Sequence, residues 1–248
     1  MKKAKPTGET APPKRRFQYR ARQDADKAEL KQRIIKVARR EFAKRDPSSV
    51  SIRKIAAAAG YSQGTIYQYF EDRRDLLIAV KIDGYESLYH QLLEIERSVS
   101  DSKRRLKEMF LAYLRFWNNN PNDFRVIFSM TETAEERRRK SGQTFADTEV
   151  SRGTSKAFMR AVGSFLADRG CRFDRKTIAA MTSTLYSAVQ GTISTRLQMP
   201  TLKWPESEVM GELVLDAILD SWSSKAAKAA QREPAAPLSL FRDETVAS

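Results

Sequence analysis

Residues 48–77, which read SSVSIRKIAAAAGYSQGTIYQYFEDRRDLL, decide the fold. Ser51 can cap a helix over residues 52–59, in which apolar and small side chains recur at helical spacing. Gly60 follows where that helix must end, and glycine adopts the left-handed backbone conformation at little cost. Ser62 can then accept a hydrogen bond from a free amide of a following helix. The stretch therefore predicts two short helices joined by a tight turn.

The second of these helices, over residues 63–70, is rich in polar and aromatic side chains that can contact DNA. These are Gln63, Thr65, Tyr67, Gln68 and Tyr69. A short helix with an exposed polar face can lie in the major groove when a first helix of small residues holds it at a steep angle. A helical hairpin inside a larger core would also explain the small residues, but not these polar and aromatic groups. We therefore interpret the stretch as a helix-turn-helix with the start of a support helix behind it.

The same stretch resembles the TetR family of transcriptional regulators, whose usual pattern is T-x-x-x-I-A-x-x-A-G-V-S-x-G-T-L-Y-x-H-F-x-x-K-x-x-L. The matching positions are Ile55, Ala56, Ala59, Gly60, Ser62, Gly64, Thr65, Tyr67, Phe70 and Leu76. The departures, all conservative in size or hydrogen-bonding capacity, are Ser51, Tyr61, Ile66, Tyr69 and Arg73. The resemblance in sequence covers about residues 30–80, and beyond them only the number and order of predicted helices are similar.

The resemblance implies a homodimeric transcriptional regulator, most often a ligand-responsive repressor, that binds a palindromic operator in double-stranded DNA. The positions expected to contact DNA are Ser51, Arg53, Lys54, Ser62, Gln63, Gly64, Thr65, Tyr67, Gln68, Tyr69 and Arg73. Gln63, Gln68 and Tyr69 are expected to read base edges, because amides pair with adenine and aromatic rings rest on thymine methyl groups. The charged and hydroxyl side chains are expected to bind phosphates.

Composition divides the chain into four parts. Residues 1–23 are basic, contain Pro and Gly and show no apolar period, so we expect a disordered arm. Residues 24–75 are expected to form the DNA-binding domain, with a first helix from about residue 24 to 45. Residues 76–228 predict amphipathic helices with no credible strand pair, and the Ala- and Pro-rich residues 229–248 predict a disordered tail. The expected fold class is all-α: an N-terminal helix-turn-helix domain followed by an all-helical ligand-binding and dimerisation domain.

In the family, the second domain encloses a pocket for an apolar or amphipathic small molecule. The side chains that could line such a pocket here are Tyr113, Trp117, Phe128, Phe158, Met181 and Tyr186. The alternative is that these side chains simply fill the core. The last two predicted helices, over residues 174–198 and 206–224, are expected to pair with a second subunit as a four-helix bundle. The expected interface residues are Leu185, Val189, Ile193, Leu213 and Ala217.

Positive charge is concentrated at the N-terminal end. The net charge is +14, and residues 1–72 carry 18 Lys or Arg against eight Asp or Glu. This asymmetry is expected of a protein whose N-terminal part meets a polyanion. The basic arm is either a solubilising tail or a segment that orders on DNA. Two other functions stay open: a structural protein that binds nucleic acid non-specifically through the arm, and a ligand sensor whose N-terminal domain no longer binds DNA.

The sequence predicts neither an enzyme nor a membrane protein. His90 is the only histidine, and no phosphate-binding glycine loop, zinc-protease motif or nucleophile elbow occurs. We therefore expect no catalytic residue, metal or cofactor. The chain contains no apolar run of about 18 residues, and we expect no secretory signal. Cys171 is the only cysteine, which excludes an internal disulfide and fits the reducing cytoplasm, where we expect the protein to act.

Overall fold

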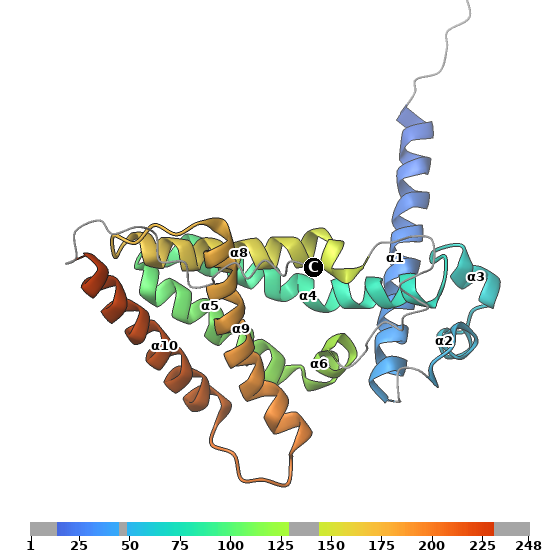
Figure 1. Cartoon of the computed structure of the whole chain (residues 1–248). Coiled ribbons are helices and arrows are strands. Elements are labelled where there is room, and N and C mark those ends of the chain that lie inside the picture. Colours follow the sequence, from blue (N-terminus) through green and yellow to red (C-terminus); the bar gives the residue numbers. More distant parts are fainter. Residues whose placement is uncertain (1–13, 45–48, 129–143, 231–248) are drawn as a thin grey trace, which may run out of the picture. The chain divides into compact units, whose positions relative to one another are not determined.

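The computed structural model describes residues 14–44, 49–128 and 144–230, and the side chains of residues 24–44, 49–128 and 144–224. All elements in these ranges are helices (Figure 1), which confirms the all-α prediction. The chain divides into two compact units, residues 1–80 and 81–248.

The first unit contains α1 (Lys14–Lys44), α2 (Ile52–Ala59), α3 (Gln63–Tyr67) and the beginning of α4 (Arg73–Ser98). Each helix contributes apolar side chains to one small core. The buried ones are Ile34, Ile35, Ala38, Phe42, Val50, Ile52, Ile55, Ala56, Ile66, Phe70, Leu76, Leu77 and Val80. Burial of these side chains supplies the hydrophobic stabilisation that holds two helices of only eight and five residues in place.

Helix α1 begins at Lys14, ten residues before its predicted start near Asp24, so the prediction of disorder is wrong for residues 14–23. No Pro or Gly occurs between Pro13 and Pro47, and Lys, Arg, Gln and Ala are good helix formers. The first six residues of α1 whose side chains are described, 24–29, are all exposed. Periodicity reports burial rather than helicity, which explains the misplaced start. The rest of the predicted arm, residues 1–13, lies outside the described residues.

Within the described residues, the second unit holds the remainder of α4 and six further elements. These are α5 (Ser102–Asn119), α6 (Pro121–Phe128), the short 3₁₀ helix η2 (Phe145–Asp147), α8 (Glu149–Ala167), α9 (Arg175–Gln198) and α10 (Ser207–Ala230). Side-chain caps begin three of them. Asp101 accepts from the Arg104 amide at 2.7 Å, Thr148 from Ser151 at 3.3 Å, and Asp174 from Thr177 at 2.7 Å. The predicted charged joint, residues 131–142, falls outside the described ranges.

Helix α5 lies at the centre of the second unit, because it packs on α8, α9 and α10. Leu106, Phe110, Tyr113, Leu114 and Trp117 of α5 are completely buried. Neighbouring helices approach it closely. A Cβ atom added to Gly211 of α10 would lie only 2.6 Å from Leu114 Cδ1, so a larger residue there would require the buried Leu114 side chain to shift.

Three ion pairs run along the contact between α5 and α10. Lys103 lies 2.6 Å from Asp220, Lys107 lies 3.0 Å from Asp216, and Arg115 lies 2.5 Å from Glu208. Each step of four or eight residues along α5 is matched by an equal step backwards along α10, so the two helices are antiparallel. Partly exposed pairs of this kind contribute roughly 0.2–1 kcal/mol each.

Candidate nucleic-acid interface

The two caps and the turn predicted in residues 51–62 are confirmed. Ser51 Oγ accepts from the Lys54 amide at 3.3 Å and begins α2. Gly60 has a φ of +73°, and the Tyr61 amide donates to the Ala56 carbonyl at 3.0 Å, which is the hydrogen bond of a left-handed helix end. Ser62 Oγ then accepts from the Thr65 amide at 3.0 Å and begins α3. Local hydrogen bonds therefore fix the angle between the two helices.

Helix α3 ends at Tyr67, three residues before its predicted end. The chain continues as a tight turn, in which the Gln68 amide donates to the Gly64 carbonyl at 3.2 Å and the Phe70 amide to the Ile66 carbonyl at 3.1 Å. The turn brings Phe70 into the core next to α1, where Lys31 Nζ lies 5.5 Å from the centre of its ring. Burial of Ile66 and Phe70 thus anchors α3 at both ends of its last turn.

Most of the candidate DNA-binding side chains are exposed. The exposed ones are Ser51, Arg53, Lys54, Ser62, Gln63, Gly64, Tyr67 and Gln68, and the half-buried ones are Thr65, Tyr69 and Arg73. Tyr67 has 53% of its surface exposed, which is unusual for a large aromatic side chain in the middle of a folded domain. A continuous polar and aromatic face therefore lies open on α3.

Two of the candidate cations already have contacts within the protein. Arg73 Nε donates to the Val50 carbonyl at 2.7 Å, and its guanidinium lies 5.5 Å from the centre of the Phe42 ring. Lys54 Nζ donates to the Ser49 carbonyl at 2.8 Å. Arg73 thereby ties the start of α4 to the segment before α2, so its first role is structural. Arg53 stays exposed on α2 as the better candidate for a phosphate contact.

The predicted effector residues form one aromatic cluster in the second unit. Tyr113, Trp117 and Phe158 are fully buried, and Phe128, Met181 and Tyr186 are half-buried against them. Ring centres of Trp117 and Phe128 are 5.4 Å apart, and those of Tyr113 and Tyr186 are 5.2 Å apart. The Trp117 Nε1–H has no hydrogen-bond partner among the described residues. A buried donor without a partner is costly, and it marks this cluster as a place where a ligand could add one.

A small polar network lies within this aromatic cluster. The hydroxyl oxygens of Tyr113 and Tyr186 are 2.9 Å apart, and the Tyr113 hydroxyl also donates to Gln190 Oε1. The Tyr85 hydroxyl lies 3.5 Å from that of Tyr186. Burial raises the pKa of Tyr85 and Tyr113 well above the ordinary value, so both hydroxyls stay protonated and can donate. Sequence reasoning missed Gln190, although its spacing of four residues from Tyr186 puts both on one helix face.

Three of the predicted interface residues are buried within a single chain. Leu185, Val189 and Ile193 have at most 1% of their surface exposed, so their assignment to a subunit contact is wrong. Helix α9 carries apolar or small side chains on two faces, and the bulkier face packs into the core of its own unit. Leu213, with 67% exposed, and Ala217, also exposed, lie outside that core.

Three further large apolar side chains near Leu213 in the sequence are exposed. Val209 on α10 and Met199 and Leu202 in the preceding loop have at least half of their surface exposed. Sequence reasoning missed Val209, although it lies one helical turn before Leu213. Val209 and Leu213 therefore leave apolar surface on α10 open to contact with another molecule.

Other chemistry finds little support in the described part of the chain. No three His, Cys, Asp or Glu side chains there are grouped so that they could hold a metal ion. None of the described helices combines the length and the apolar character that a membrane span requires.

Residues 34–80 match the model of a family described as bacterial regulatory proteins, tetR family. Over 89 residues the chain is 34% identical to an uncharacterized HTH-type transcriptional regulator of Mycobacterium tuberculosis, covering 36% of this chain and 44% of that protein. Over 100 residues it is 25% identical to the HTH-type transcriptional activator FasR of Mycolicibacterium smegmatis, covering 40% and 46%. The chain thus spans less than half of the length of these two relatives.

Solved structures share the fold over most of the chain. The transcriptional regulator FadR from Bacillus subtilis, solved in complex with stearoyl-CoA, has a TM-score of 0.62 at 17% identity, covering 76% of this chain and 97% of that one. The TetR family regulator PfmR from Thermus thermophilus has a TM-score of 0.54 at 17% identity, covering 75% and 97%. Identities this low show the fold alone. Together with the capped helix-turn-helix, the family match supports one conclusion: residues 34–80 form a helix-turn-helix domain of the tetR family of bacterial regulatory proteins.

Proposed function

We propose that the protein is a sequence-specific DNA-binding transcriptional regulator that binds a roughly palindromic operator as a homodimer. The observation that carries the proposal is the capped helix-turn-helix of α2 and α3, which leaves Gln63, Tyr67 and Gln68 exposed. Five residues of helix are too few to be stable alone, and here the core holds them with their polar face open. That is the arrangement needed to enter a major groove.

Each subunit places α3 in a major groove in this proposal. The amides of Gln63 and Gln68 contact base edges, since a glutamine amide can pair with adenine through two hydrogen bonds. Tyr67, Arg53 and Lys54 contact phosphates on either side and fix the register without reading sequence. A two-fold symmetric dimer repeats these contacts on a second half-site, so the operator is roughly palindromic. Such a regulator meets its operator in the cytoplasm.

The exposed apolar surface of α10 supports the dimer. Val209, Leu213 and Ala217 follow one another at spacings of four residues and lie on one side of the helix. Covering Val209 and Leu213 would remove apolar surface from water, at about 25 cal/mol for each Å² buried. A second copy of α10, together with α9 of both chains, gives a four-helix contact in which these side chains face one another.

The aromatic cluster around Tyr113 and Trp117 supports an apolar or amphipathic effector. Its ring surfaces would contact an apolar chain, while the Trp117 N–H and the tyrosine hydroxyls would orient a polar group. The structural relative FadR was solved with stearoyl-CoA, which makes a long-chain acyl compound the first effector to test. Effector binding changes the separation of the two DNA-binding units and releases the operator, so the protein acts as a repressor.

Selection of binding sites from a pool of random duplexes with the full-length protein tests the proposal. We expect a palindromic motif bound at least about 1,000-fold more tightly than a scrambled duplex at the same salt concentration. Equal affinity for both duplexes would favour a non-specific nucleic-acid-binding protein instead. Transcription in vitro from a promoter that carries the selected site should then fall when the protein is added. Stearoyl-CoA should restore it, and coenzyme A without the acyl chain should not.

A further inference from the structure

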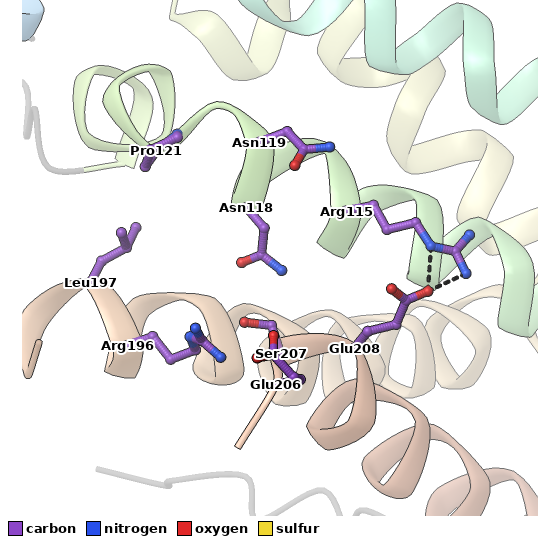
Figure 2. A pocket seen from close by; sticks show the side chains of 9 residues that line it. All are labelled: Arg115, Asn118, Asn119, Pro121, Arg196, Leu197, Glu206, Ser207 and Glu208. Carbon is purple, nitrogen blue, oxygen red and sulfur yellow. Dashed lines mark hydrogen bonds and ion pairs between the residues drawn. The ribbon is translucent and has the colours of Figure 1, made fainter. Parts of the chain in front are cut away.

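A cleft of about 550 Å³ opens on the second unit, and none of the residues that line it belongs to the aromatic cluster. It lies where the ends of α5 and α9 meet the beginnings of α6 and α10 (Figure 2). Asn118 points from α5 towards the side that carries Arg196 and Glu206, and Leu197 points towards Pro121 at the other end. The cleft thus has a polar half and an apolar half.

Two opposite charges line this cleft without pairing. Arg196 and Glu206 make no ion pair with each other, and the described residues contain no ion-pair partner for either. The other two charged residues of the lining, Arg115 and Glu208, do pair, at 2.5 Å, and close one wall (Figure 2). The lining carries two arginines and two glutamates, so its net charge is zero. One positive and one negative group are left for a ligand.

The side of the cleft formed by the loop between α9 and α10 is already held in place. Arg196 Nη1 donates to the Pro205 carbonyl at 2.5 Å, which leaves its Nε and Nη2 groups for a ligand. The Trp204 indole N–H donates to the Met199 carbonyl at 3.0 Å within the same loop. Because these contacts exist before a ligand arrives, binding costs less conformational entropy.

We propose that this cleft binds a small zwitterion of the α-amino acid class. The carboxylate of the ligand pairs with Arg196, which offers planar N–H donors that match it. The ammonium group pairs with Glu206, and the ligand side chain lies along Leu197 and Pro121, within reach of the Asn118 amide. A ligand with only one charge would leave either Arg196 or Glu206 without a counter-charge, so the pair selects a molecule that carries both.

Isothermal titration calorimetry of the full-length protein without DNA tests this site. The probes are L-leucine and L-glutamine, which share the zwitterion but differ in side chain. Isocaproate and isoamylamine, which are L-leucine without its ammonium and without its carboxylate, are the matched controls. We expect at least one of the two amino acids to bind. If L-leucine binds, isocaproate and isoamylamine should each bind at least about tenfold more weakly than L-leucine, because each lacks one hydrogen-bonded charge.

Two substitutions locate the binding to the cleft. Arg196→Gln and Glu206→Gln should each weaken binding of the amino acid at least about tenfold, while Arg172→Gln and Glu212→Gln, exposed residues outside the cleft, should not. Glu206 makes no side-chain contact that its substitution would disturb, so E206Q tests the site even if R196Q loosens the loop. The proposal is overturned if neither amino acid binds, if isocaproate binds as tightly as L-leucine, or if E206Q leaves the affinity unchanged. The experiment contains no DNA, so its result is independent of the proposed regulatory function.

Discussion

In the proposed complex with DNA, side chains on the face of α3 make two kinds of contact, and substitutions can separate them. Gln68 is exposed directly after the last helical residue, where its amide can reach a base edge. Tyr67 is exposed one position earlier, and its hydroxyl can reach a phosphate. Base contacts carry sequence information and phosphate contacts do not.

We expect Gln68→Ala to relax base preference at one position of each half-site. The loss should be roughly 1–3 kcal/mol on the preferred base, because one bidentate contact is removed. Tyr67→Phe is the matched control, since it should weaken binding to every sequence about equally. Repeating the site selection with both variants measures this. If the Gln68→Ala motif is the same as that of the wild type, Gln68 does not read a base.

Arg53 and Arg73 make a second contrast, between a cation in solvent and a cation held by the protein. Arg73→Ala removes the hydrogen bond to the Val50 carbonyl and the contact with the Phe42 ring, so the free energy of unfolding should fall by about 1–3 kcal/mol. Arg53→Ala should leave the free energy of unfolding unchanged. Its plot of log operator affinity against log salt concentration should become less steep by about 0.9. Thermal melts and salt titrations of both variants measure these effects. If the Arg73→Ala protein is as stable as the wild type, the structural role of Arg73 is wrong and a phosphate contact is favoured instead.

At the scale of elements, α1 combines a packed half and a basic half. Ile34, Ile35, Ala38 and Phe42 hold its second half in the core of the first unit. Its first ten residues, 14–23, add five cations and no acidic residue to the same continuous helix. A helix fixed at one end holds its charges along one direction, over about 15 Å for ten residues, whereas a coil of similar reach samples many directions. Phosphates beside the half-site are the partner that this charge fits.

Deleting residues 1–22 should weaken operator binding and make the plot of log affinity against log salt concentration less steep. The slope should change by about 0.9 for each phosphate that the shortened protein no longer neutralises. The bases selected at the centre of each half-site should stay the same, because Gln63 and Gln68 remain. An unchanged slope would show that these cations do not contact DNA.

Local signals in the sequence predict the elements well and their partners poorly. Ser51, Gly60 and Ser62 fix caps and a turn through hydrogen bonds within a few residues, so their roles can be read from neighbouring letters. Leu185 and Leu213 are both apolar residues on long helices, but one is completely buried and the other is 67% exposed. Periodicity cannot decide which face of a two-faced helix packs inside its own chain. That choice depends on helices distant in sequence.

At the scale of the whole molecule, the same two leucines separate folding from assembly. Leu213→Asp should give folded monomers, because it puts a charge on the exposed surface of α10 that a second subunit would cover. Leu185→Asp should instead unfold the second unit, because it buries a charge in the core of one chain. Light scattering and circular dichroism distinguish the two outcomes. If the Leu213→Asp protein is still a dimer at micromolar concentration, the exposed surface of α10 is not part of the interface.

Gly211 has a consequence for assembly beyond the packing of two helices. Sliding α10 by four residues along α5 would still put Lys103 opposite Asp216 and Lys107 opposite Glu212, but Arg115 would face Trp204 instead of Glu208. Only one of the three ion pairs is lost, so the ion pairs distinguish the two alignments weakly. The close packing of Leu114 against the backbone of Gly211 distinguishes the two alignments more strongly, because a slide would put a residue with a side chain opposite Leu114. A slide of four residues is about 6 Å, and Val209 and Leu213 would be displaced by that distance. In the proposed dimer, Gly211 therefore helps to fix the position at which the second subunit meets Val209 and Leu213.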